Sequence, residues 1–243
     1  MIYIYGANGM LGRYMCTVLR HQAVEFHPIT REEWIHPQEL DDSIIINCAG
    51  SIRQRNEDLL DMVKINSLFP LELRRWHERV VHISTDCVFS GKNAPYFAGD
   101  IPDATDNYGM TKIMGEKAGL VIRTSFIGEE KKNKLSLLEW CKSKKGEQVQ
   151  GYINHIWSGV TALTLARFIA ERIKSDQDWD EMIQVTSPPI SKYELICQIS
   201  EVYKLNLKVK PVEVDPIDRS LRGLNFPPIE EQLHELKDFY RYL

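Results

Sequence analysis

The segment Gly6-Ala-Asn-Gly9-Met-Leu-Gly12 decides the fold, because it joins the apolar run Ile2–Tyr5 directly to a helical stretch, Met10–His21. A strand that turns this sharply into a helix leaves free N–H groups at the helix N-terminus, where a pyrophosphate can bind. Side chains at the glycine positions would block that approach. The spacing G-x-x-G-x-x-G after a first strand therefore predicts a dinucleotide site, which we expect to include Gly6, Asn8, Gly9, Met10, Leu11 and Gly12.

Apolar strand-like runs and helical stretches alternate through the first half of the chain. Strand-like runs continue at 24–29, 44–48, 80–83 and 120–122, and a helical pattern covers 59–75. Largely apolar strands separated by helices indicate a parallel sheet that is covered on both faces. We therefore predict an α/β fold of the Rossmann type, doubly wound, with its dinucleotide-binding core over residues 1–128.

The second half has a different character, beginning with the charged stretch after Gly128. Residues 182–185 are expected to return to the sheet as a last strand, and 207–214 to form a further strand. We predict a small substrate-binding lobe over 129–243, interleaved with the last strand of the sheet. Its expected helices are 135–142, 161–174, 193–203 and 229–242.

Composition excludes several classes of protein. Hydrophobic residues make up 43% and charged residues 26%, and the net charge is −4. Because no basic stripe stands out, a nucleic-acid partner is not expected. No apolar run approaches the ~20 residues that span a bilayer, and no charged leader precedes the first strand. The five cysteines are scattered, without a C-x-x-C pair, so we expect a cytoplasmic protein without membrane contact, disulfide framework or metal site.

The end of the second predicted strand bears on the choice of cofactor. An acidic residue there would bind the ribose 2′-OH of NAD, whereas an arginine accommodates the 2′-phosphate of NADP. Arg31 stands at this point, with Arg13 just after the glycine turn, so NADP(H) is favoured over NAD(H). The alternative is that Arg31 only lies in the solvated first turn of a helix capped by Thr30.

A second group of residues has the chemistry of a proton donor. Tyr108 and Lys112 are four apart, on one face of a helix. A phenol with a pKa near 10 is a poor catalyst at neutral pH, and a neighbouring ammonium, aided by the cationic oxidised nicotinamide, is expected to lower that pKa. Thr85 follows a strand and can hydrogen-bond a substrate oxygen, whereas Ser84 is expected to cap the following turn.

Two further segments are expected beside the cofactor. The third strand ends in small residues, which allow the backbone to pass close to a flat ring: Cys48, Ala49 and Gly50. Asn66 lies within a helical stretch, where asparagine is disfavoured. It either braces the site, through a backbone carbonyl or a water, or lies at an ordinary surface position.

Together these motifs resemble extended short-chain dehydrogenases/reductases, and specifically the dTDP-4-dehydrorhamnose reductase group. The residues that carry the likeness are Gly6-Ala-Asn-Gly-Met-Leu-Gly12, Ile46-Asn-Cys-Ala-Gly50, Ile65-Asn-Ser67, Ser84-Thr-Asp-Cys-Val-Phe89, Tyr108-Gly-Met-Thr-Lys-Ile-Met-Gly-Glu116 and Val121-Ile-Arg-Thr-Ser125.

The resemblance implies a seven-stranded, mostly parallel sheet and a reduction of the 4-keto group on a nucleotide-linked 4-keto-6-deoxy sugar, in deoxysugar or polysaccharide biosynthesis. It makes Tyr108 the proton donor, Lys112 its activator and anchor for the cofactor ribose, and Thr85 the third catalytic residue. A homodimer is common for such a fold. Candidate substrate contacts are Asp86, Cys87, Asn154, His155 and Trp157, with Arg222 as a further polar group.

Two alternatives stay open at this point. Cys87 stands where the reductases usually have tyrosine, and related bifunctional 3,5-epimerase/4-reductases carry a catalytic cysteine there. The segment 129–134 that directly follows Gly128 contains no histidine, so Lys131, Lys132 or Lys134 would have to act as the second epimerisation residue. We favour Cys87 as a small packed thiol. Other relatives of this fold are non-catalytic, NADP-binding regulatory subunits, and the presence of the three catalytic residues argues against that role.

Overall fold

The structure is a computed structural model that describes residues 1–40, 43–52, 58–132, 134–175 and 179–243. A seven-stranded sheet forms its centre, and all neighbouring strands in it are parallel. In spatial order the strands are β14 (Leu224–Asn225), β10 (Met182–Thr186), β5 (Leu120–Thr124), β4 (Val80–Thr85), β3 (Ile44–Asn47), β1 (Ile2–Tyr5) and β2 (His27–Ile29). The doubly wound α/β fold is confirmed.

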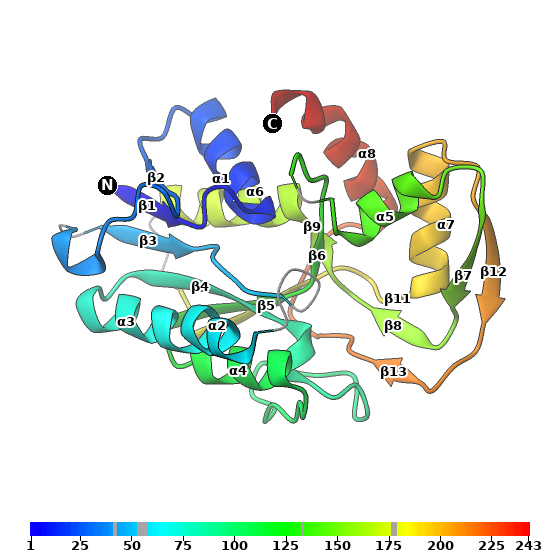
Figure 1. Ribbon diagram of the computed structural model, residues 1–243, viewed down its shortest axis with the longest axis horizontal. Helices are drawn as coiled ribbons and strands as arrows, with labels where there is room; N and C mark the ends of the chain where they lie inside the picture. The colour runs from blue at the N-terminus through cyan, green and yellow to red at the C-terminus, as the bar shows by residue number, and fades with distance from the viewer. Residues whose placement is uncertain (41–42, 53–57, 133, 176–178) are drawn as a thin grey trace.

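Helices cover both faces of this sheet (Figure 1). One layer packs on the larger apolar core and contains α1 (Met10–His21), α6 (Ala162–Lys174) and α8 (Ile229–Phe239). The other contains α2 (Leu59–Val63), a π-helical turn (Lys64–Leu68), α3 (Phe69–Trp76) and α4 (Asn107–Gly115). The predicted helix over 59–75 is thus one helical run with a π turn in its middle. Among the described residues, no helix is long and apolar enough to cross a membrane.

The second half of the chain adds strands β10 and β14 to the sheet and builds a lobe at one end of the molecule (Figure 1). The division at residue 128 stays a prediction. The lobe contains α5 (Leu137–Ser143), α7 (Lys192–Val202) and three small sheets: β6 (Phe126–Ile127) with β9 (Val160–Thr161), β7 (Gln148–Tyr152) with β12 (Lys208–Val212), and β8 (His155–Trp157) between β11 (Ile190–Ser191) and β13 (Ile217–Asp218). Short 3₁₀ turns lie at Pro37–Glu39, Asp86–Val88 and Tyr240–Tyr242.

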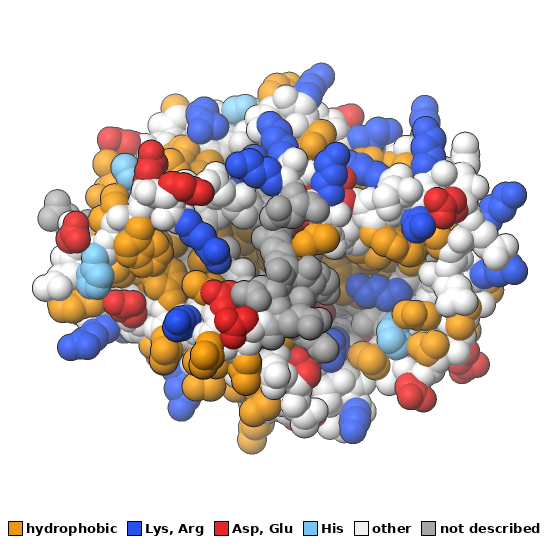
Figure 2. Space-filling model, viewed as in Figure 1, with side chains coloured by type: hydrophobic (Ala, Val, Ile, Leu, Met, Phe, Trp, Pro, Cys, Tyr) orange, Lys and Arg blue, Asp and Glu red, His pale blue; other side chains and the backbone are white. Residues whose placement is uncertain are grey.

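The strand order places the site. The chain leaves β1 for β2 on one side and then crosses to β3 on the other side of β1. In open α/β sheets, ligands bind outside the carboxyl ends of the strands where the order reverses in this way. Gly6 follows β1 and Cys48 follows β3, so the predicted cofactor residues meet at this crevice. On the face seen in Figure 2, basic and acidic side chains are interspersed rather than gathered by sign.

Candidate active site

The glycine turn is tightly packed against the end of β3. Gly6 has a φ of +76°, and a Cβ there would lie 2.7 Å from the backbone nitrogen of Ala49. A Cβ at Gly12 would lie 2.3 Å from the carbonyl oxygen of Gly6. Gly9 is the N-cap of α1 and supplies no side-chain cap, which leaves the N–H groups of the first turn for a ligand. This backbone cradle fits a dinucleotide pyrophosphate.

Asn66 braces the segment after β3. It lies in the π turn and is fully buried, so it is not a surface residue. Its Nδ2 donates to the carbonyl oxygen of Ser51 at 2.9 Å, and its Oδ1 accepts from the Ser51 N–H at 2.9 Å. Nδ2 also donates to Oγ1 of Thr111 on α4 at 3.2 Å. The bracing therefore uses the amide side chain, and it links the cofactor edge to the helix that carries Tyr108.

Arg31 is exposed just beyond the tip of β2. Residues 31–33 form a bend, so the helix that Thr30 could have capped does not form; Thr30 Oγ1 accepts from the Glu33 N–H at 3.1 Å. Arg13 instead contacts the glycine turn, because its Nε donates to the Asn8 carbonyl oxygen at 3.0 Å. Lys132 lies near enough to Glu32 to act on it electrostatically, which brings a second basic residue toward this tip.

The three candidate catalytic residues converge at the carboxyl end of β4. Thr85 is the last residue of β4, and Tyr108 and Lys112 lie on α4. The side chains of Thr85 and Tyr108 are hydrogen-bonded. Lys112 Nζ donates to the carbonyl oxygen of Ile83 on β4 at 2.7 Å. A hydroxyl, a phenol and an ammonium thus lie together beside the predicted cofactor crevice.

The predicted lowering of the Tyr108 pKa is wrong for this structure. Burial is the main cause that raises the pKa of the phenol above its usual range, and the nearby Cys87 raises it further. The hydrogen bond with Thr85 acts in the opposite direction and lowers it. Burial lowers the pKa of Lys112 to about 8, against the opposite effect of Glu116. At neutral pH Tyr108 is therefore a protonated phenol, which can give a proton, and Lys112 is a buried ammonium.

The expected roles of Ser84 and Thr85 differ from those observed. Thr85, not Ser84, caps the following turn, since its Oγ1 accepts from the Cys87 N–H at 3.1 Å. Ser84 Oγ donates to Glu116 Oε1 at 2.6 Å. Glu116 also accepts from Arg123 Nε and Nη2, both at 2.8 Å, in a buried ion pair. This network ties β4 and β5 to the end of α4 and so fixes the helix that carries Tyr108.

The predicted substrate contacts fall into two groups. Asp86 is buried and Cys87 half-buried, both directly after Thr85. The side chains of Asn154 and His155 instead contact the backbone of the lobe itself. Asn154 Nδ2 donates to the Val214 carbonyl oxygen, and His155 Nε2 lies 3.0 Å from the Asp215 carbonyl oxygen. Trp157 is 2% exposed, at the end of β8. Arg222 is exposed, and its backbone N–H donates to Tyr96.

Two basic residues near Asp86 and Cys87 were not predicted from the sequence. Arg219 Nη1 lies 3.4 Å from the Cys87 sulfur, and Lys192 lies near enough to Asp86 and Cys87 to act on both. Both residues belong to the lobe, and no local motif marks them. Burial raises the pKa of the Cys87 thiol to about 12, with Asp86 raising it further and Arg219 opposing. Cys87 is therefore a neutral thiol.

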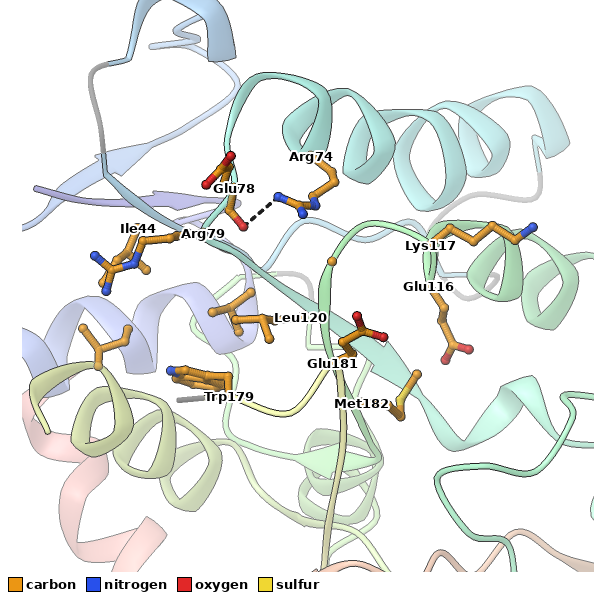
Figure 3. A pocket seen from close by; sticks show the side chains of 13 residues that line it. Ile44, Arg74, Glu78, Arg79, Glu116, Lys117, Leu120, Trp179, Glu181 and Met182 are labelled. Carbon is orange, nitrogen blue, oxygen red and sulfur yellow. Dashed lines mark hydrogen bonds between the residues drawn. The ribbon is translucent and has the colours of Figure 1, made fainter. Parts of the chain in front are cut away.

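A separate pocket of about 730 Å³ opens at the opposite edge of the sheet, where β3, β5 and β10 begin (Figure 3). Arg74, Arg79, Lys117, Glu78 and Glu181 surround it with charges of both signs. One of these, Arg74, already donates to the carbonyl oxygen of Glu78 at 2.8 Å. This pocket lies away from the crevice and from Tyr108. Among the described residues, no group of three or more His, Cys, Asp or Glu side chains could hold a metal ion.

Known proteins resemble this chain in both sequence and fold. Methionine adenosyltransferase 2 subunit beta of Mus musculus is 28% identical over 92% of this chain and 78% of its own length. The match to its Danio rerio counterpart is 25% identical and covers 69% of this chain but only 58% of that protein. A dTDP-4-dehydrorhamnose reductase of Mycolicibacterium smegmatis is 30% identical over 52% of this chain and 45% of its own length.

The fold match extends over nearly the whole chain. The structure of dTDP-4-dehydrorhamnose reductase from Bacillus anthracis, in complex with NADP, superposes with a TM-score of 0.85 at 21% identity, covering 98% of this chain and 99% of that one. The family described as "RmlD substrate binding domain" matches residues 1–222. With the glycine turn and the Tyr108–Lys112 pair in the places found above, the chain belongs to this family of extended short-chain dehydrogenase/reductase-like proteins.

Proposed function

We propose that this protein is a reductase that prefers NADP(H) and reduces the 4-keto group of a nucleotide-linked 4-keto-6-deoxy sugar, in deoxysugar or polysaccharide biosynthesis. The observation that carries this proposal is the convergence of Thr85, Tyr108 and Lys112 beside a glycine cradle. The reductase and NADP named for the Bacillus anthracis structure support it. A homodimer also stays a prediction.

Each of the three residues has a distinct task in this reaction. NADPH, when bound on the glycine turn, supplies the hydride. Tyr108 donates its phenolic proton, which the phenol holds at neutral pH, to the substrate carbonyl oxygen. Thr85 orients the same oxygen through its hydroxyl. Lys112 lies one helical turn after Tyr108 on α4, and its positive charge stabilises the phenolate that remains after proton transfer.

We expect Arg31→Asp to reverse the cofactor preference. The change removes a cation that would pair with the 2′-phosphate and adds a carboxylate that repels it. NADPH binding should therefore weaken by about 10- to 100-fold, whereas NADH binding should be spared. Fluorescence titration of both cofactors measures this effect. Lys117→Asp, an exposed change at the opposite edge of the sheet, is the matched control. Equal dissociation constants for NADPH and NADH in the native protein would show that Arg31 does not select the cofactor.

Cys87 distinguishes the reductase from the bifunctional epimerase/reductase. Because its thiol is neutral, we expect Cys87→Ser to slow 4-keto reduction by less than about tenfold, whereas loss of a general base costs about 10²- to 10⁴-fold. The rate of NADPH oxidation and the solvent deuterium exchange beside the keto group are the two readouts. Exchange by the native protein that disappears in Cys87→Ser would favour the epimerase/reductase.

A second candidate function is a cofactor-binding, non-catalytic subunit of another enzyme. Its support is the similarity to methionine adenosyltransferase 2 subunit beta over 92% of this chain. Such a subunit needs the glycine turn but not the proton donor. The presence of Thr85, Tyr108 and Lys112 in one cluster favours the reductase, and the two functions differ in whether hydride is transferred.

A further inference from the structure

Thr111 lies on α4 between Tyr108 and Lys112, and its side chain is buried. A threonine hydroxyl competes with the helical hydrogen bonds around it, so threonine is a poor choice for the interior of a helix. Here the hydroxyl is used on both sides. Oγ1 donates to the Tyr108 carbonyl oxygen at 2.9 Å and accepts from Asn66 Nδ2 at 3.2 Å. The side chain of Thr111 therefore joins the backbone of Tyr108 to the π turn.

Asn66 fixes the other end of this connection. Its Oδ1 accepts from the Ser51 N–H, and its Nδ2 donates to the Ser51 carbonyl oxygen, both at 2.9 Å. The second hydrogen of Nδ2 goes to Thr111. An amide that is bonded in this way has one orientation, because a flipped amide would set its oxygen against the Ser51 carbonyl oxygen and its nitrogen against the Ser51 N–H. The hydroxyl of Thr111 is thus held at a fixed place relative to the segment after β3.

The backbone of α4 also lies directly against the π turn. Ser67 Oγ donates to the Thr111 carbonyl oxygen at 2.8 Å. One helical turn further along α4, a Cβ at Gly115 would lie 2.1 Å from the carbonyl oxygen of Asn66. Two consecutive residues of the π turn therefore hold Thr111, one through its hydroxyl and the other through its carbonyl. A buried network whose polar groups have partners is rigid.

The hydrogen bonds of Thr111 reach Tyr108 through the first turn of α4. Asp106 caps this turn by accepting from the N–H groups of Tyr108 and Gly109, both at 3.1 Å. The cap precedes the helix, whereas Thr111 binds the Tyr108 carbonyl oxygen from within it. Loss of the Thr111 hydroxyl would break the side-chain connection between this turn and the π turn. A shift of about 1 Å in a reacting group can cost about 10²-fold in rate.

We propose that Thr111 is a positioning residue for Tyr108, which sets the place of the phenol relative to the cofactor edge at Ser51. This inference deepens the proposed function and rests on it, since a proton donor has to meet both the cofactor and the substrate. Thr111 is not itself a proton donor in the reaction, because its hydroxyl already donates to the Tyr108 carbonyl oxygen. Its effect on the reaction passes through the geometry of Tyr108.

The test compares Thr111→Val with Thr111→Ser. Valine keeps the branched shape of threonine and removes the hydroxyl, whereas serine keeps the hydroxyl and loses a methyl group. We expect Thr111→Val to lower kcat for 4-keto reduction by about 10-fold or more, with KM and the Kd for NADPH within about twofold of native. Thr111→Ser should restore most of the native kcat. A threonine with only a packing role predicts the reverse order, because serine leaves the larger gap.

Thr164→Val is the matched control. Thr164 lies on α6, in the layer on the opposite face of the sheet, and its Oγ1 lies 2.9 Å from the Oγ1 of Thr161. This variant also loses a hydroxyl that is bonded to another side chain, and it should keep the native kcat. Thermal unfolding and NADPH titration show whether each variant is folded. If Thr111→Val does not fold, Thr111→Ala takes its place in the comparison with Thr111→Ser.

A second readout does not need turnover. In protein labelled with ¹³C at the tyrosine Cζ, the Tyr108 resonance is the one that is missing from the spectrum of Tyr108→Phe. We expect this resonance to shift in Thr111→Val, because the phenol changes its place relative to Thr85, its hydrogen-bond partner. The resonance should keep its native position in Thr111→Ser and in Thr164→Val.

An unmoved Tyr108 resonance in Thr111→Val would overturn the inference, and so would a native kcat in that variant. A Thr111→Ser variant that is impaired as strongly as Thr111→Val would overturn it as well. If the resonance moves in Thr111→Val alone while the native protein never oxidises NADPH, Thr111 positions Tyr108 and the reductase proposal fails. If the native protein reduces the sugar and Thr111→Val matches it in kcat and resonance, the reductase proposal stands and this inference fails.

Discussion

Tyr108→Phe is expected to lower the rate of 4-keto reduction by about 10²- to 10⁴-fold, the usual contribution of a general acid. The change removes one hydroxyl and leaves the ring packed on α4, so the fold and the affinity for NADPH should stay near native. The structural reason is that the phenol keeps its proton at neutral pH and has Thr85 as its hydrogen-bond partner. Stopped-flow measurement of NADPH oxidation gives the rate.

Tyr242→Phe is the control for this experiment, since it makes the same change at a tyrosine that is 49% exposed near the C-terminus. The control should react at the native rate. If Tyr108→Phe and native protein oxidise NADPH equally fast, the proton comes from another group, and the assignment of Tyr108 is wrong.

Lys112→Met is expected to lower the rate of 4-keto reduction at least as much, by about 10³-fold or more. The reason is that a buried ammonium one helical turn from the phenolate stabilises the charge that develops in the reaction.

The same change should make the protein more stable at pH 7. The pKa of Lys112 is lowered to about 8 in the folded state, against about 10.4 in the unfolded chain. Below pH 8 the fold therefore carries a buried charge at a cost, and methionine removes that cost.

The pKa values of Lys112 in the folded and unfolded chain also predict how stability changes with pH. Between pH 8 and about 10.4 the unfolded chain binds more protons than the folded one, so Lys112 contributes stability that increases with pH. Reduction by the native protein should instead decline as pH rises through about 8, when the ammonium is lost. Thermal unfolding and pH–rate profiles check both, with exposed Lys117→Met as control. A Lys112→Met variant with native activity would contradict the role assigned to this lysine.

Local sequence signals predicted the elements that carry the cofactor cradle. The helix Met10–His21 has the predicted bounds, because glycines precede it and its apolar spacing is regular. The strand predicted over 24–29 is reduced to His27–Ile29, because only these three residues pair with β1. Strand β14 was missed because its two residues have no periodicity to detect. The π turn around Asn66 was missed because one extra residue per turn barely disturbs the apolar pattern.

The site was predictable where motif and strand end coincide. Thr85 ends a parallel strand at the edge where ligands bind, and the spacing of four residues puts Tyr108 and Lys112 on one face of α4. Burial was not predictable, and it reversed the expected direction of the Tyr108 pKa shift. Lys192 and Arg219 were out of reach as well, since only the folding of the lobe over the core brings them to Cys87.

As a reductase, this protein transfers a hydride and is not only a cofactor-binding subunit. The direct test is mass spectrometry of the product formed from a dTDP-4-keto-6-deoxy sugar and NADPH deuterated at nicotinamide C4, with each face labelled in a separate reaction. We predict one deuterium at C4 of the reduced sugar from one of the two labelled cofactors. NADPH binding by the native protein, with no deuterium in the sugar from either cofactor, would contradict the proposed reductase activity and favour the cofactor-binding subunit.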